Sequence, residues 1–109
     1  MPDAARGDHL VPLHPEAVAG DPQRLRWVTP AASLPFLGPV AVAPGALGTL
    51  AAEGVLLDLV VEADAVAMSL RDGLSWRGEG ARVRSALHEA LARPGDWLPD
   101  VGAATLRDG

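Results

Sequence analysis

Two histidines near the start of the chain belong to the residue types that bind metal ions. His9 and His14 lie close together, beside the carboxylates Asp8 and Glu16. Imidazole nitrogens and carboxylate oxygens in one place could hold a transition-metal ion. Pro12 stands between the two histidines, however, and prevents the regular helix that would align their rings. We therefore expect solvated histidines in an irregular segment, and no metal site.

Covalent catalysis has few residues to draw on in this sequence. Cys, Lys and Tyr are absent, so the chain offers no thiolate, Schiff-base amine or phenol. No serine lies in a Gly-x-Ser-x-Gly turn. His88 falls in a predicted helix, where we expect it to flank the packed face instead of acting as a general base. The sequence thus predicts no enzyme, no catalytic residue and no cofactor.

Anion binding is a third chemistry to consider, around Gly78-Glu79-Gly80. Glycines ahead of a helix can cradle a phosphate, but a phosphate loop adds Lys and Ser or Thr at fixed positions, and Glu79 would repel the ligand. We expect these glycines to form a mobile start to the helix. The neighbouring Arg77, Arg82 and Arg84 could bind an acidic segment of a partner, although solvated, scattered arginines are the commoner case.

Composition limits the classes of partner. The chain has 109 residues, a hydrophobic fraction of 49% and a formal net charge of −5. Its arginines are scattered, so no surface is predicted to follow a phosphate backbone, and we expect no nucleic-acid partner. No apolar run is long enough to cross a bilayer, and the N-terminus lacks the pattern of a secretory signal. We expect a cytoplasmic protein without a membrane partner. The absence of Lys, Asn, Ile and Tyr is typical of a GC-rich bacterial genome.

The elements that would position these residues follow from hydrophobic periodicity and from Gly and Pro breaks. Alternation of apolar residues and β-branched runs predict four strands, and apolar stripes at helical spacing predict two helices. The predicted strands cover residues 24–29, 36–42, 55–62 and 65–71, and the predicted helices cover residues 44–53 and 79–93. Ser75 is a candidate N-cap for the second helix.

The pattern predicts one small α+β domain at residues 24–97. Its elements would run β-β-α-β-β-α and form two layers, a mainly antiparallel sheet covered by helices on one face. Residues 1–23 are rich in Pro and Gly and are expected to form an irregular arm, and residues 98–109 a loose tail. The chain has four aromatic residues. Trp27 and Trp76 could be core anchors or exposed binding residues, and the small number of aromatics favours the core.

Part of this pattern resembles the N-terminal domain of Nfu-type (NifU-like) iron–sulfur scaffold proteins. The segment Thr29-Pro30-Ala31-Ala32-Ser33-Leu34-Pro35-Phe36 is similar to the Thr-Pro and Ser-Leu-x-Phe motif near the start of that domain. Gly54-Val55 looks like the start of its strand after a short helix, and Trp76 stands where the family often has a tryptophan. The positions that carry the resemblance, and that we expect to serve structure or partner binding, are Thr29, Pro30, Ser33, Leu34, Phe36, Gly54, Val55 and Trp76.

Two departures from the family limit what the resemblance implies. The Thr-Pro segment of the family carries Asn and a second Pro, whereas this chain has Ala31-Ala32 and is one residue shorter. Nfu proteins bind their cluster through a Cys-x-x-Cys pair in a separate C-terminal domain, and this chain has no cysteine. The resemblance therefore implies a stand-alone copy of the domain that does not ligate the cluster.

The sequence as a whole favours a non-enzymatic protein-interaction domain. The resemblance places it in iron–sulfur cluster assembly, as an accessory or adaptor that binds another protein. The alternative is a small regulatory domain or enzyme accessory subunit unrelated to iron. A small enzyme that uses His and carboxylates is the least favoured hypothesis.

Overall fold

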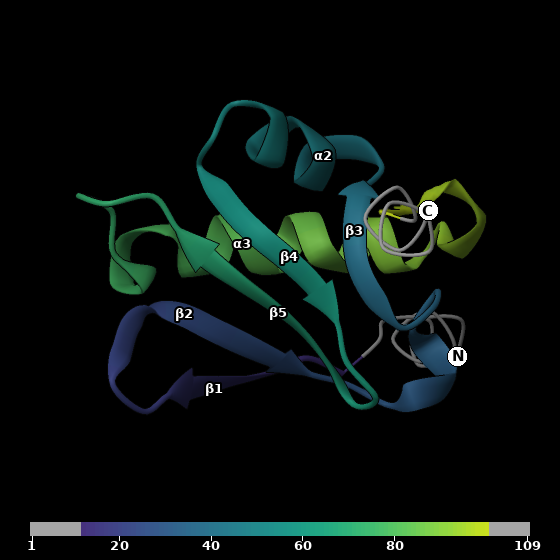
Figure 1. Ribbon diagram of the computed structural model, residues 1–109, viewed down its shortest axis with the longest axis horizontal. Helices are drawn as coiled ribbons and strands as arrows, with labels where there is room; N and C mark the ends of the chain where they lie inside the picture. Colours follow the sequence, from purple (N-terminus) through teal and green to yellow (C-terminus); the bar gives the residue numbers. More distant parts are fainter. Residues whose placement is uncertain (1–11, 101–109) are drawn as a thin grey trace, which may run out of the picture.

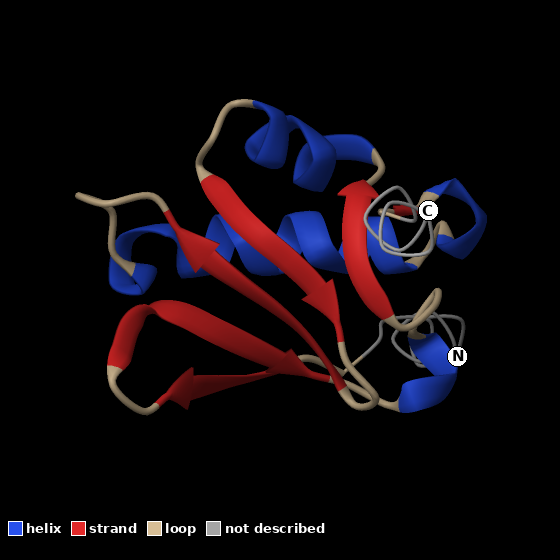
Figure 2. Ribbon diagram, viewed as in Figure 1, coloured by secondary structure: helices blue, strands red, loops and turns tan. Residues whose placement is uncertain are grey.

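The computed structural model describes residues 12–100 as a six-stranded antiparallel sheet with helices on one face (Figures 1 and 2). The strands are β1 (His14–Val18), β2 (Asp21–Val28), β3 (Gly38–Val42), β4 (Leu56–Val61), β5 (Ala65–Leu70) and β6 (Leu98–Pro99). The helices are α2 (Gly45–Ala52) and α3 (Trp76–Leu91), with 3-10 turns η1 (Ala31–Ser33) and η2 (Pro94–Asp96). The strand order across the sheet is β1-β2-β5-β4-β3-β6. The α+β class, the antiparallel sheet and a single compact domain are therefore confirmed.

The hairpin β4–β5 forms the centre of the sheet, as its apolar alternation predicts. Val61 pairs with Val66, and the side chains of Val66, Met68 and Leu70 are buried on the face that the helices cover. A bulge interrupts the pairing at Asp58, which is the only non-glycine residue with positive φ (53°) in the described part of the chain. Asp tolerates this left-handed conformation better than most residues, and the bulge turns the strand locally.

Helix α3 begins at Trp76, earlier than the predicted residue 79. The Ser75 side chain caps the helix by accepting a hydrogen bond from the Gly78 backbone N–H at 3.2 Å. This cap brings Gly78-Glu79-Gly80 into the first turns of the helix, so these glycines lie inside α3 and not ahead of it, where they were predicted. The buried stripe of the helix consists of Val83, Ala86, Leu87, Ala90 and Leu91.

The predicted boundaries of the arm and tail are wrong where the structure describes them. Residues 14–23 belong to the β1–β2 hairpin, in which His14 pairs with Val28 and Glu16 with Arg26. The prolines of this segment obscured a strand that lies at the edge of the sheet, where a missing N–H is tolerated. Leu98 and Pro99 form β6 against β3. Residues 1–11 and 101–109 lie outside the described residues.

These two strands also change the predicted order of elements. The observed order is β-β-β-α-β-β-α-β, so the predicted β-β-α-β-β-α order is not that of the complete domain. The second predicted strand is also shorter, because Phe36 and Leu37 precede β3.

The helix layer covers the sheet unevenly. Helix α3 lies behind β4 and β5, and α2 packs beside it toward β3 and β4 (Figure 1). Behind β1 and β2 no helix of the described chain is present (Figure 2). One flank of α3 therefore borders a part of the sheet that no helix of the described residues covers.

Candidate functional site

A groove lies along this flank of α3, between the helix and the β1–β2 hairpin. It has a volume of about 500 Å³. We call it the β1–α3 groove. Its described lining residues are Leu13, Pro15, Leu25, Trp27, Trp76, Arg77, Gly80, Ala81 and Arg84. Most of this surface is apolar, and its aromatic and arginine side chains are the types enriched at protein interfaces.

The floor of the groove is built from β2. Strand alternation sends Leu25 and Trp27 to the side of the sheet that α3 covers, and both are buried. The ring of Trp76 meets that of Trp27 edge to face, with centroids 6.1 Å apart and ring planes at 76°. Such aromatic pairs are stabilising beyond the area that they bury. Trp76 is itself only half-buried, so it belongs both to the core and to the groove.

The side chain of Gln23 fixes the relative position of helix and hairpin. Its Nε2 group lies 3.1 to 3.2 Å from the carbonyl oxygens of Leu70, Arg71 and Leu74. An amide NH₂ has two hydrogens to donate, so these three acceptors share them. These hydrogen bonds tie β2, which forms the groove floor, to the segment that joins β5 to α3.

Arg77 and Arg84 give the groove a positive rim. Both side chains are exposed, and neither makes an ion pair or hydrogen bond with another described residue. They stand seven residues apart on α3, or about 10.5 Å along the helix axis. No carboxylate is among the described lining residues. A cationic rim is notable on a chain whose net charge is −5.

Two buried polar side-chain atoms have no hydrogen-bond partner among the described residues. They are the indole N–H of Trp27, in the groove floor, and the hydroxyl of Thr29, one residue beyond the end of β2. An unpaired buried donor of this kind costs about 1–3 kcal/mol. This cost bears on stability, because both atoms are shielded from solvent and a ligand in the groove would not reach them without a rearrangement.

On the opposite face of the sheet, Arg26 is surrounded by three carboxylates that accept hydrogen bonds from all its guanidinium nitrogens. Arg26 donates to Glu62 at 2.7 Å, to Asp64 at 2.8 Å and to Glu16 on β1. The hydrogen bond to Glu62, followed by that to Glu16, raises the pKa of Arg26 above its usual value, although partial desolvation opposes this. Because all its nitrogens have carboxylate partners, Arg26 is not a free anion-binding group.

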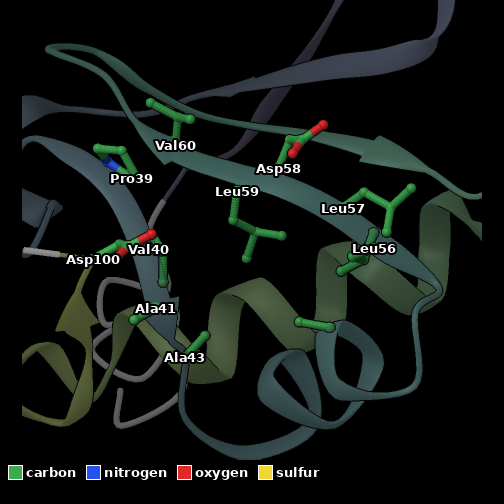
Figure 3. Close-up of a pocket in the computed structure, with 11 residues that line it drawn as sticks. Pro39, Val40, Ala41, Ala43, Leu56, Leu57, Asp58, Leu59, Val60 and Asp100 are labelled. Atoms are coloured by element: carbon green, nitrogen blue, oxygen red, sulfur yellow. The ribbon is translucent and has the colours of Figure 1, made fainter. Parts of the chain in front are cut away.

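A second hollow of about 460 Å³ opens where β3 diverges from β4 (Figure 3). The two strands pair only through Gly38–Val61 and Pro39–Val60. Figure 3 shows Leu59 pointing from β4 toward the helices, whereas Asp58 projects from the other side of the strand. Asp58 and Asp100 lie apart on the rim (Figure 3). Among the described residues, no group of three His, Asp or Glu side chains could hold a metal ion.

The positions that carry the family resemblance do not form one site. Thr29, Pro30 and Ser33 follow β2, and the Thr29 N–H donates to the Asp64 carbonyl in the β4–β5 turn at 2.9 Å. Leu34 and Phe36 of the same segment line a smaller hollow of about 330 Å³ with the exposed Leu37.

The other three positions lie elsewhere. Gly54 (φ 79°) and the buried Val55 precede β4, at the opposite end of that strand from the β4–β5 turn. Only Trp76 lines the β1–α3 groove.

The histidines are also separated. His14 is exposed on β1, His88 is half-buried on α3, and His9 lies outside the described residues. His88 lines neither the groove nor the β3–β4 hollow.

Comparison of the chain with protein-family models, with curated proteins and with solved structures finds no match. The resemblance to the Nfu N-terminal domain therefore stays a prediction from the sequence. Neither helix of the described part of the chain has the length and apolar character needed to span a bilayer.

Proposed function

We propose that this protein is a protein-interaction domain and that the β1–α3 groove is its binding surface. The observation that carries the proposal is an apolar groove with a half-buried Trp76 and, at its rim, two arginines whose side chains have no partner in the described part of the chain. Tryptophan and arginine in a partly desolvated setting are the side chains that most often dominate binding energy. The half-buried Trp76 and the exposed Pro15 offer apolar area that a partner would remove from water.

The chemistry of the groove supports binding rather than catalysis. Its described lining residues include no Ser, Thr, His, Asp or Glu, so no nucleophile, general acid or general base faces it. Arginine stays protonated and supplies charge and hydrogen-bond donors only. The proposal therefore includes the absence of catalysis at this site.

The iron–sulfur context is a narrower version of the same proposal. It rests on the Thr29–Phe36 segment and on Gly54-Val55. In this version the groove binds a component of the cluster-assembly machinery. In the alternative it binds an enzyme for which this chain is a regulatory or accessory subunit. The identity of the captured partner separates the two.

The test is affinity capture from the native host with quantitative mass spectrometry. Ala81→Trp fills the groove from an exposed position on α3, so it should leave the fold intact and block the partner. Ser85→Trp adds the same ring at an exposed α3 position outside the groove and serves as the matched control. We expect a partner that binds the wild type and Ser85→Trp but is lost with Ala81→Trp. If every captured protein binds all three equally, the groove is not the binding surface.

A further inference from the structure

We infer that the β1–α3 groove binds an acidic amphipathic helix of a partner protein. This inference rests on the proposed function and specifies the partner's chemistry. Three observations lead to it: the unfilled position in the helix layer, the small residues on the groove flank of α3, and the charge of the rim.

The unfilled position lies beside α3 in the helix layer, and its surface is mostly apolar. On the other side of α3, helix α2 packs against it and covers the sheet toward β3 and β4. On the groove side, Leu25 and Trp27 of β2 face the same layer and are buried by neighbouring side chains. No helix of the described residues lies behind β2 (Figure 2). A helix laid there would complete the layer symmetrically, at the 8–10 Å spacing that packed helices adopt.

The flank of α3 is shaped for close approach of another helix. Gly80 and Ala81 lie between the two rim arginines and present almost no side chain to the groove. Trp76 forms the wall at the start of α3. Large apolar side chains at i, i+3, i+4 and i+7 of a partner helix would fill the space above Leu25.

The rim selects the charge of the occupant. A partner helix alongside α3 can place carboxylates two turns apart, at i and i+7, which matches the axial distance between Arg77 and Arg84. Guanidinium groups bind carboxylates in a bidentate manner. Neither arginine must first leave an existing partner among the described residues. A basic or neutral helix would gain nothing at these two positions.

An extended strand is a poorer occupant. Strand β1 is only five residues long, contains Pro15, and changes register at Ala17 and Val18. A short edge with a proline and an irregularity is a device that discourages further strand pairing. The helix is therefore the occupant to which the geometry points.

The test uses a display library of helical peptides of about 20 residues with fixed Leu anchors and randomised flanking positions. We expect selected binders that are lost with Ala81→Trp to be enriched in Asp and Glu at positions seven apart. For a synthesised binder, changing these two residues to Gln should weaken affinity at least about tenfold. The same loss is expected when the protein carries Arg77→Glu and Arg84→Glu, and the selection should then favour Lys and Arg.

A matched variant controls for overall charge. Arg71→Glu with Arg93→Glu makes the same change in net charge at two exposed arginines outside the groove, whose side chains have no partner among the described residues. It should leave both the affinity and the selected sequences unchanged. If this variant weakens binding as much as the Arg77 and Arg84 pair, recognition is a general charge effect and the inference is wrong.

The remaining outcomes separate this inference from the proposed function. Groove-dependent binders without acidic enrichment, or binders that tolerate a central proline, would overturn the acidic helix and leave the interaction surface in place. Self-association of the protein that Ala81→Trp abolishes would assign the groove to a second copy. The library could yield no groove-dependent binder while affinity capture yields a partner that Ala81→Trp loses. That result would overturn the helical occupant and leave the binding surface in place. The affinity-capture experiment decides whether the groove is a binding surface at all.

Discussion

Trp76 donates a 2.9 Å hydrogen bond from its indole nitrogen to the backbone carbonyl of Gln23, so the first turn of α3 is fastened to the start of β2. The bond joins residues 53 positions apart in the sequence. The same tryptophan ring then contacts Trp27 and forms a wall of the groove. One side chain therefore both fastens α3 to β2 and lines the groove for which we propose a binding role.

Trp76→Phe should isolate the contribution of the indole hydrogen bond to stability. Phenylalanine keeps a ring beside Trp27 but cannot donate to the Gln23 carbonyl, so the free energy of unfolding should fall by about 1–2 kcal/mol. Urea denaturation measures the change. Trp76→Ala removes the ring as well and should cost more. Equal stability of wild type and Trp76→Phe would mean that the indole bond contributes nothing net.

Leu87 lies at the centre of the buried stripe of α3 and is completely buried. Leu87→Ala should lower the free energy of unfolding by about 2–5 kcal/mol, because it removes apolar contacts and leaves a cavity. Leu37→Ala is the matched control, since Leu37 is 71% exposed. That control should stay within about 0.5 kcal/mol of the wild type. Similar melting temperatures for the two variants would contradict the packing of α3 on the sheet.

Two helical glycines should respond in opposite directions to alanine. A Cβ at Gly48 would collide with the backbone carbonyl of Ala43, whereas a Cβ at Gly80 would meet nothing within 4 Å. Gly48→Ala should therefore destabilise the protein and displace α2. Gly80→Ala should stabilise it by about 0.5–1 kcal/mol through lower backbone entropy in the unfolded chain. Thermal unfolding followed by circular dichroism gives both signs, and a stabilising Gly48→Ala would contradict the approach of α2 to Ala43.

The unpaired hydroxyl of Thr29 offers a stabilising change. Thr29→Val removes a buried polar atom that has no partner within residues 12–100, so the free energy of unfolding should rise by about 1 kcal/mol. Thr49→Val is the control, because Thr49 is exposed and its hydroxyl donates to the Gly45 carbonyl at 3.3 Å. It should gain no stability. Destabilisation of the Thr29→Val variant would show that the hydroxyl has a hydrogen-bond partner in solution.

The central elements could be predicted from the sequence because their signals are local. The apolar run and its return at residues 55–71 predict β4 and β5, and the stripe of Val83, Leu87 and Leu91 predicts α3. Strand β1 could not be predicted in the same way. Its Pro15 and the flanking Pro12 read as an irregular arm, and only pairing with β2 makes residues 14–18 a strand.

The groove was partly visible in the sequence. The choice between core and binding roles for Trp76, and the acidic-partner option for Arg77 and Arg84, concern residues that do line it. Their convergence with Leu13 and Pro15 was not visible, because it depends on a hairpin that the proline pattern concealed. The resemblance to Nfu domains gave no guidance here, since of its eight positions only Trp76 reaches the groove.

The weak pairing of β3 with β4 divides the sheet into two parts that should differ in the free energy of local opening. Only two residue pairs join these strands, and Pro39 in one of them has no N–H to donate. On the other side of β4, the hairpin with β5 contributes the fully buried Val66 and Met68. Local opening should release β3 together with β6 while β4, β5 and β2 stay closed. In native-state hydrogen exchange, amides of β3 should exchange through an opening that depends less on denaturant than global unfolding does, and those of β5 only through global unfolding.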